Sequence, residues 1–574
     1  MTAPVTTPAA TLPGAPTEPD ALDGLARVRL RPGVAVTPLQ GGLHLRGWRS
    51  GVTLEGSRAL PALWQLLAAA LETGDHAALV TRAPAGTPLR AALNTLLGHL
   101  RAHDLLVDRA GSTPDWLHAA AARPGAAAAA VAAAHPRILD ADPAGPFARA
   151  AARALSRAGA TPTTVRSPGG FLLLTAGPGG ATAVGAALTG DGGFVTAPGT
   201  PAQVAQDART LTVRLGPPTA ATATQAPAAQ TALLAGAAAH RLLCAVAGLP
   251  DPAAEGEDDH VLPGVPAVLV ATAAPLRASY RSWLGPRRPA PGPAAPPLAP
   301  PDTLAQAMHR LTALTDERLG VLPEPLPPGT LSQLLVARVS CPAPGGTLLA
   351  AAARTDLARL DALCRAAELH LGGPQSPGLA VGATEQHAWG RALRRATATT
   401  TAGEPLPDRS WTDHPQARYW WHTLTARLHQ RAELVVARLA PGVHAATVRL
   451  PGLPSTGAVE ATAGDAAAFA ALGAVARTVS ADLTHRHLAL PSGAGAALAV
   501  AGLELTSWED EGWTTGWLAA VADREPALLT ALHELTGLRA APADLPRPDP
   551  RGIAGALRTC GYTVLTTTTD RSAP

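Results

Sequence analysis

The chain has 574 residues, of which 47% are hydrophobic, and its 46 basic and 43 acidic side chains leave a net charge of +3. This length predicts about two to four domains, and the near-neutral charge gives no support to nucleic-acid binding. The sequence contains no lysine, which excludes both a Walker-type phosphate loop and a Schiff-base mechanism.

The cysteine pattern and the lengths of the apolar runs indicate which cellular compartment the protein suits. Cys244, Cys341, Cys364 and Cys560 lie far apart and form no C-x-x-C pair, so neither a zinc ribbon nor a redox motif is expected. A reducing cytoplasm suits such cysteines. We find neither a signal peptide nor an unbroken apolar run of ~20 residues, so no membrane segment is expected.

The N-terminal region predicts a small module after a disordered tail. Residues 1–24 are mainly Thr, Pro and Ala, a composition that favours disorder. Three short strands follow, separated by Gly41-Gly42 and Ser50-Gly51 turn signals. These strands are expected at 34–36, 43–45 and 52–54.

Three helices are expected after these strands. Ser57 is the predicted N-cap of the first helix, which has leucines at helical spacing and ends at Gly74. A second short helix follows, and residues 88–103 repeat the leucine pattern. The order βββααα predicts a winged-helix module over residues 25–110.

Residues 111–286 show strands that alternate with helices. Strands are expected at 137–139, 163–166, 171–174 and 267–271, and helices at 147–158 and 231–248. This alternation favours an α/β layer with a mostly parallel sheet. The loop at 142–147 keeps only Gly145 and contains two prolines, so it predicts a structural turn and not a nucleotide site. The Gly-rich segments 177–180 and 190–193 also predict turns, because neither has a Lys-Ser/Thr tail.

A proline-rich segment separates this region from the rest. Residues 287–301 read RRPAPGPAAPPLAPP, a composition that favours extended polyproline conformation, so we assign 287–303 as a linker. Residues 304–574 then form the last predicted domain.

The architecture resembles a known family, the ocin-ThiF-like partner proteins, or F proteins, of azole-forming YcaO cyclodehydratases in ribosomal peptide and thiopeptide biosynthesis. The segments 232–238 and 262–269 are similar to a degenerate ThiF-like domain, and 314–320, LTDERLG, is similar to the opening of a YcaO domain. The resemblance implies an α/β multidomain fold with an N-terminal RiPP recognition element, a degenerate ThiF-like α/β domain and a degenerate YcaO-like α+β domain.

This sequence lacks most of the catalytic residues of that family at the corresponding positions. Family members that activate an amide with ATP use carboxylates on facing helices to hold magnesium and nucleotide. Here one such helix retains Glu368 beside Arg365 and Leu369, and the next carries Arg394 and Arg395 without a Glu-Arg pair. The sequence therefore predicts a pseudoenzyme with no catalytic, cofactor-binding or metal-binding residues. His414 and His422 lack a third ligand at suitable spacing and are expected on a helix face.

Peptide capture is the function that we expect. A leader peptide would add as a strand beside Val52, Thr53 and Leu54, with its apolar side chains in a groove against the helix 88–103. The predicted groove residues are Leu93, Leu96, Leu97 and Leu100, and the predicted contacts for acidic leader residues are Arg90 and Arg101. The family resemblance implies a precursor peptide, a YcaO cyclodehydratase and an azoline dehydrogenase as partners, and neither nucleic acid nor membrane.

Three other functions stay open on the sequence alone. A cyclodehydratase active by itself needs ATP hydrolysis, and the missing carboxylates oppose it. A winged-helix DNA-binding regulator needs a basic recognition helix, but residues 88–103 carry only Arg90 and Arg101. A ThiF-like activating enzyme needs a glycine turn and a reactive cysteine, and neither is evident.

Overall fold

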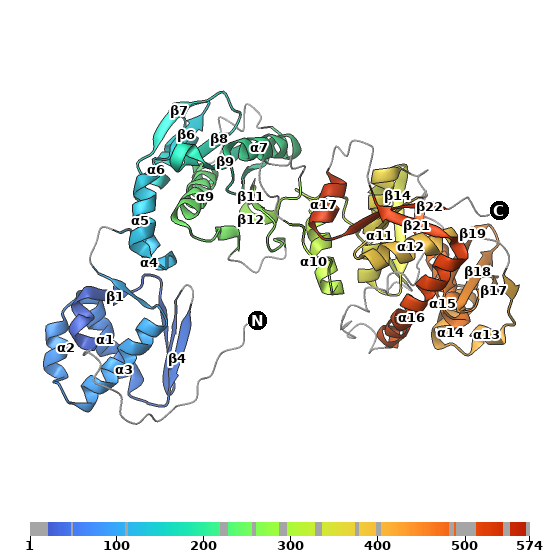
Figure 1. Ribbon diagram of the computed structural model, residues 1–574, viewed down its shortest axis with the longest axis horizontal. Coiled ribbons are helices and arrows are strands. Elements are labelled where there is room, and N and C mark those ends of the chain that lie inside the picture. The colour runs from blue at the N-terminus through green and yellow to red at the C-terminus, as the bar shows by residue number, and fades with distance from the viewer. Residues whose placement is uncertain are drawn as a thin grey trace. The chain divides into compact units, whose positions relative to one another are not determined.

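The computed structural model describes twelve segments of the chain (Figure 1). The chain divides into two compact units. Unit 1 comprises Met1–Gly185, Pro198–Pro201 and Thr231–Pro252, and unit 2 comprises Ala186–Ala197, Ala202–Gln230 and Ala253–Pro574. The described residues are 21–47, 50–109, 113–217, 228–254, 260–285, 296–327, 336–373, 378–397, 403–480, 487–489, 513–543 and 552–569.

The first part of unit 1 is a small α/β module with two sheets. The strands β2 (Ala35–Leu39), β3 (Gly42–Arg46) and β4 (Gly51–Glu55) form an antiparallel sheet in the order β2-β3-β4. The strands β1 (Val28–Leu30) and β5 (Leu106–Asp108) form an antiparallel pair. The three predicted strands are therefore confirmed, whereas β1 was not predicted.

Three helices cover this sheet. They are α1 (Leu60–Thr73), α2 (His76–Arg82) and α3 (Pro88–Ala102). Gly74 ends α1 in the left-handed conformation at φ 77°, as predicted. The N-cap of α1 is Ala59 and not Ser57, because the Ser57 hydroxyl accepts from the Ala59 N–H in a turn before the helix.

The predicted tail ends earlier than residue 24. The segment η1 (Ala21–Arg27) is a 3₁₀ helix, and its Leu22 and Leu25 are fully buried in the module's core. The Leu22 N–H donates to Asn94 Oδ1 of α3 at 3.2 Å. Residues 21–24 thus belong to the folded module, and the rest of the predicted tail lies outside the described residues.

A mixed seven-stranded sheet follows, and the boundary between the two units crosses its strand β9. Its order is β12-β11-β10-β9-β8-β6-β7, with the strands β6 (Arg137–Asp140), β7 (Thr163–Arg166), β8 (Leu172–Ala176), β9 (Thr182–Thr189), β10 (Gly192–Val195), β11 (Ala267–Ala273) and β12 (Leu276–Ser282). The accompanying helices are α4 (Asp115–Ala120), α5 (Pro124–Ala133), α6 (Pro146–Arg157), α7 (Pro201–Leu215) and α9 (Ala228–Ala247), with short turns η2 (Pro178–Gly180) and η3 (Pro252–Ala254).

The prediction of a mostly parallel sheet is wrong. Within this sheet β6 and β7 form a parallel pair, whereas β6–β8, β9–β10, β10–β11 and β11–β12 are antiparallel. The pairs β9–β10 and β11–β12 are hairpins with short turns, and such turns allow only antiparallel pairing because a parallel crossover needs about a dozen or more residues. The pairs β6–β8 and β10–β11 are antiparallel although longer segments separate their strands. The glycine segment 177–180 forms a turn, as predicted. The segment 190–193 begins as a turn and continues into β10, so its prediction holds only in part.

The helix α9 is long and apolar enough to cross a membrane by length and composition alone. More than half of its most apolar window is buried within the protein. Its Arg241 is fully buried, and Arg241 Nε donates to Asp251 Oδ1 at 3.0 Å. A core helix accounts for these observations.

The described C-terminal part of unit 2 contains three sheets and eight α-helices. The sheets have the orders β13-β14-β20, β15-β22-β21 and β16-β17-β18-β19. Their strands are β13 (Ala337–Ala343), β14 (Gly346–Ala352), β15 (Leu379–Gly382), β16 (Glu404–Pro405), β17 (Glu433–Ala440), β18 (Val443–Leu450), β19 (Leu453–Glu460), β20 (His487–Ala489), β21 (Leu538–Pro542) and β22 (Thr563–Thr569).

The helices of this part are α10 (Leu304–Leu314), α11 (Thr355–Gly372), α12 (Glu385–Thr397), α13 (Arg409–Thr412), α14 (Pro415–His422), α15 (Ala463–Thr478), α16 (Trp513–Thr536) and α17 (Ile553–Thr559), with a π-helical turn η4 (Thr423–Arg427) after α14. The alanine-rich α15 is buried along most of its length, because small side chains allow close packing against β18, β19 and α14.

Candidate functional site

The strand β4 offers an unpaired edge within the described part of the module. It pairs with β3 through a register that places Thr53 opposite His44 and Leu54 opposite Leu43, and no described strand lies on its other side. The opposite edge strand, β2, contains Pro38, which has no N–H to donate. The edge of β4 is therefore the better of the two for adding another strand.

The three predicted residues of β4 alternate between its two faces. Val52 is buried, Leu54 is half-buried and Thr53 is exposed. Thr53 Oγ1 lies 2.8 Å from His44 Nδ1 across the strand pair. A peptide on this edge would thus meet main-chain groups first, with Thr53 on the outer face.

The four predicted groove leucines of α3 lie in the core. Leu93, Leu96, Leu97 and Leu100 are at most 2% exposed. They pack in one cluster with Leu22 and Leu25 of η1, and of these two only Leu22 lies within the predicted tail of residues 1–24. In the described structure these four side chains form part of the core of the module, and their contact with a leader peptide stays a prediction.

The two predicted arginines of α3 have different surroundings. Arg90 is buried, and its Nη1 donates to the Ala83 carbonyl at 3.3 Å, so it holds the start of α3 against the end of α2. Arg101 is exposed in the last turn of α3. Of the two, only Arg101 has the exposure that contact with an acidic peptide needs.

In unit 2, Glu368 of α11 is surrounded by arginines. Its Oε2 accepts from Arg365 Nη1 at 3.0 Å and from Arg395 Nη2 at 2.8 Å, and its Oε1 accepts from the Val381 N–H at 3.1 Å. Arg391 Nη2 lies 3.6 Å from Oε1. Burial raises the pKa of Glu368, but attraction to Arg391, Arg395 and Arg365 outweighs burial and leaves the pKa below its ordinary value.

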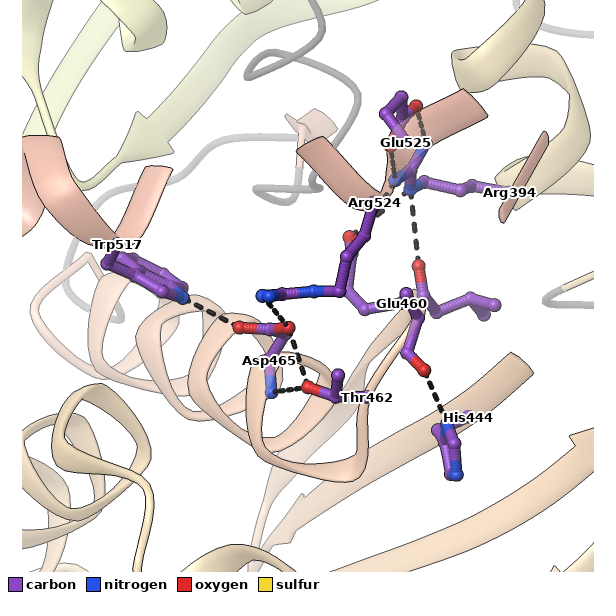
Figure 2. A network of polar contacts seen from close by, with 10 residues as sticks. Arg394, His444, Glu460, Thr462, Asp465, Trp517, Arg524 and Glu525 are labelled. Carbon is purple, nitrogen blue, oxygen red and sulfur yellow. Dashed lines mark hydrogen bonds and ion pairs between the residues drawn. The ribbon is translucent and has the colours of Figure 1, made fainter. Parts of the chain in front are cut away.

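A second buried cluster was not predicted from the sequence. Arg394 of α12 forms paired bonds with two carboxylates, Glu460 at the end of β19 and Glu525 of α16 (Figure 2). The Arg394–Glu525 distances are both 2.6 Å, and Arg394 Nη2 lies 2.9 Å from Glu460 Oε2. Burial lowers the pKa of Arg394, but attraction to Glu460 and Glu525 raises it above its ordinary value. Both carboxylates are therefore occupied by a guanidinium.

A third cluster surrounds Asp465 in the first turn of α15 (Figure 2). Thr462 caps this helix, and its hydroxyl lies 2.6 Å from Asp465 Oδ2. Trp517 Nε1 donates to Asp465 Oδ1 at 2.8 Å, and Arg524 Nη2 donates to Oδ2 at 2.7 Å. Burial raises the pKa of Asp465, but hydrogen bonds from His414, Thr462 and Trp517 and the charge of Arg524 outweigh it and lower the pKa to about 2.

The described residues contain no group of three His, Cys, Asp or Glu side chains placed to hold a metal ion. His414 faces Asp465, with Nε2 at 3.4 Å from Oδ1, whereas His422 is exposed at the end of α14. The four cysteines are buried and form no disulfide, and burial raises the pKa of Cys341, Cys364 and Cys560 to about 12. These thiols are poor nucleophiles near neutral pH.

The fold defines the chain as a mixed α/β multidomain protein. No family model matches it, and no curated protein matches it. Among solved structures it is similar to a heterocyclase in complex with substrate and cofactor, with 12% identity, a TM-score of 0.48 and 94% of each chain covered. It is also similar to the heterocyclase TruD, with 12% identity, a TM-score of 0.44 and 94% of each chain covered.

Proposed function

We propose that this chain is a non-catalytic partner that binds the leader of a ribosomal precursor peptide and presents the peptide to an ATP-dependent YcaO cyclodehydratase for conversion of Cys, Ser or Thr to azolines. The observation that carries the proposal is the edge of β4, which pairs with no other described strand, contains no proline and exposes Thr53. In this proposal the N-terminal module is a winged-helix recognition element, followed by degenerate ThiF-like and YcaO-like domains.

Strand addition suits this edge physically. A peptide beside Val52, Thr53 and Leu54 gains main-chain hydrogen bonds, which fix its register independently of its side chains. Specificity then comes from the side chains that flank the edge, and the exposed Arg101 suits an acidic leader residue. Holding the leader raises the effective concentration of the core peptide at the partner's active site, so that a chain without catalytic residues controls turnover.

The charge pattern of unit 2 supports the non-catalytic part of the proposal. Mg²⁺ requires carboxylate or phosphate oxygens as ligands. Glu368 already accepts from two arginines and lies near a third, and Glu460 and Glu525 both accept from Arg394. Since these carboxylates are neutralised within the protein, ATP and Mg²⁺ are assigned to the partner enzyme. An azoline dehydrogenase is a further partner. The four cysteines form no disulfide, which suits the cytoplasm.

Hydrogen exchange on the intact chain tests the proposal most directly. A fluorescent leader from a precursor peptide encoded beside this chain is first titrated by anisotropy, and the complex is then followed by deuterium uptake. We expect micromolar or tighter binding and slower exchange in β4, Gly51–Glu55, because its outward N–H groups gain partners. The strand β2, Ala35–Leu39, is the internal control and keeps its exchange rate.

Three outcomes contradict the proposal and separate the alternatives. The absence of leader binding rules out peptide capture. Mg²⁺-dependent ATP hydrolysis by the purified chain favours a cyclodehydratase that acts by itself. Tight, salt-sensitive binding to duplex DNA with protection of α3 favours a winged-helix regulator.

A further inference from the structure

Two hydrogen bonds close the β3–β4 hairpin at its two ends. The Gly47 N–H donates to the Ser50 carbonyl at 2.8 Å, and the Gly56 N–H donates to the Gly41 carbonyl at 3.3 Å. Both bonds continue the register of the strand pair. Because hydrogen-bonded and non-hydrogen-bonded pairs alternate along antiparallel strands, these two bonds fix the alternation for the whole hairpin.

This alternation decides which residues of β4 face its free edge. Counted from either closing bond, Val52 and Leu54 are hydrogen-bonded to β3, whereas the residues between and beside them are not. The N–H and C=O groups of Gly51, Thr53 and Glu55 therefore point away from β3. No described strand pairs with them on that side. A strand added to this edge bonds to these three residues.

The same three residues place their side-chain positions on the outer face of the sheet. Their partners in β3 are, in order, Arg46, His44 and Gly42. The neighbouring pair Leu45 and Val52 lies on the opposite face, in the core of the module. Side chains alternate between the two faces of a strand. Every second side chain of an added peptide therefore lies on the outer face, in line with these pairs.

The two ends of the outer face carry opposite charges. Arg46 and Glu55 are both exposed, and neither forms an ion pair with another described residue. The residue opposite Glu55 is Gly42, so β3 offers this carboxylate no side chain. Gly51 separates Arg46 from the edge and has no side chain either. The guanidinium can therefore extend over Gly51 to an added strand two spacings away, at about 10 Å.

We propose that the leader segment at this edge runs antiparallel to β4 and carries a basic residue opposite Glu55 and an acidic residue four positions later, opposite Gly51 and beside Arg46. The inference rests on the strand addition of the proposed function and adds the charge pattern of the peptide. Antiparallel pairing is slightly more stable per residue than parallel pairing. Opposite charges attract across neighbouring strands and like charges repel, so this pattern fixes both register and direction.

Three designed peptides test the charge pattern. Each has an N-terminal fluorophore and a C-terminal amide. The basic-first peptide reads Ala-Arg-Val-Thr-Val-Glu-Ala, the acidic-first peptide exchanges its Arg and Glu, and the neutral peptide has Gln at both places. All three are titrated against the full chain by anisotropy at low ionic strength, where surface charges are screened least. The basic-first peptide is expected to bind at least about fivefold more tightly than the neutral one and about threefold more tightly than the acidic-first one.

Charge reversals in the chain assign the contacts. Glu55→Arg and Arg46→Glu are each expected to weaken binding of the basic-first peptide at least about fivefold. The double variant keeps the net charge and is expected to prefer the acidic-first peptide. The melting temperature is expected to stay unchanged, because both side chains are exposed. The matched control is Arg82→Glu in α2, a helix that packs on the core face through Leu79, and it leaves binding unchanged.

Several results overturn the inference. Equal affinity of the parent for the three peptides removes the charge pattern, and tighter binding of the acidic-first peptide reverses the direction of the strand. A double variant that still prefers the basic-first peptide places the charged contacts elsewhere. If the encoded leader binds with protection of β4 while the three peptides bind equally, the proposed function stands and this inference fails. If neither the leader nor any peptide binds, both fail.

Discussion

Arg394 donates to both oxygens of Glu525 at 2.6 Å, although the two residues are 131 positions apart in the sequence. Glu460 accepts from the same guanidinium, so one cation joins α12, β19 and α16. Both carboxylates are at most 1% exposed. The Arg394 guanidinium therefore neutralises the two buried carboxylates and holds them together.

Replacing Arg394 by Met is expected to destabilise unit 2 by about 3–5 kcal/mol, because two buried carboxylates lose their cation. The fall in the thermal or urea midpoint measures this effect. The matched control is Arg395→Met, since its partner Glu368 retains Arg365 and Arg391 and the loss is smaller. Adding Glu460→Leu and Glu525→Leu to Arg394→Met is expected to recover much of the stability. If Arg394→Met has the same midpoint of unfolding as the parent, the contacts of Arg394 with Glu460 and Glu525 do not stabilise the fold.

Asp465 predicts an acid-sensitive contribution to stability. Its folded pKa of about 2 lies below the ordinary value of 3.8, so the carboxylate stabilises the fold above pH ~4. Its contribution, about 2 kcal/mol from this shift, is lost as the pH falls from about 4 towards 2. We expect the difference in unfolding free energy between the parent and Asp465→Asn to shrink over this interval. A difference that stays constant with pH contradicts the assignment.

The sequence predicted those elements that local patterns determine. Leucine spacing located α1 and α3, and the glycine at position 74 located the end of α1. The helix at 231–248 and the strands at 137–139 and 267–271 were also found, since each is rich in apolar residues. These features depend on residues within a few positions of one another.

The sequence missed the features that depend on distant partners. Nothing near Glu460 or Glu525 indicates Arg394, because these partners are 66 and 131 positions away. The predicted strand directions in the seven-stranded sheet were wrong because the alternation of strands and helices along the chain does not determine which strands pair, and β6 pairs with β8 and β10 with β11 across long segments. The first four residues of η1, 21–24, were assigned to the tail because the composition of residues 1–24 favours disorder, whereas the burial of Leu22 depends on contact with α3.

The variant Glu368→Gln tests whether the Glu368 carboxylate has a structural or a catalytic role. The variant leaves three arginines around a neutral amide, so we expect a fall in the midpoint of unfolding that corresponds to about 3 kcal/mol or more. The folded fraction is expected to support azoline formation by the reconstituted complex at the parent's rate. A stable variant that abolishes turnover contradicts this expectation and assigns Glu368 to catalysis.

Arg31 connects β5 and α4 within unit 1. It is 5% exposed, its Nε donates to the Asp104 carbonyl at 2.8 Å, and its Nη1 donates to the carbonyls of His118 and Ala121 near the end of α4. Arg31→Met leaves these carbonyls without their donor and is expected to cost about 2–3 kcal/mol. The control is Arg29→Met, whose exposed pair with Asp115 contributes at most about 1 kcal/mol. Equal effects of the two variants on the melting midpoint contradict the assignment.

Leu22→Ala tests whether η1 belongs to the folded module. Leu22 is fully buried against α3, so removing three carbons from its side chain leaves a cavity and is expected to cost about 2–5 kcal/mol. Hydrogen exchange should then rise in α3, Pro88–Ala102, because η1 packs directly on that helix. Leu39→Ala, a half-buried position of β2, is the matched control and is expected to change stability by less than about 1 kcal/mol. If Leu22→Ala changes neither stability nor the exchange of α3, the segment is a tail as the composition suggested, and α3 has an open apolar face after all. That face would then be available to the leader peptide, so the same experiment decides whether the peptide meets the leucines of α3 or only the edge of β4.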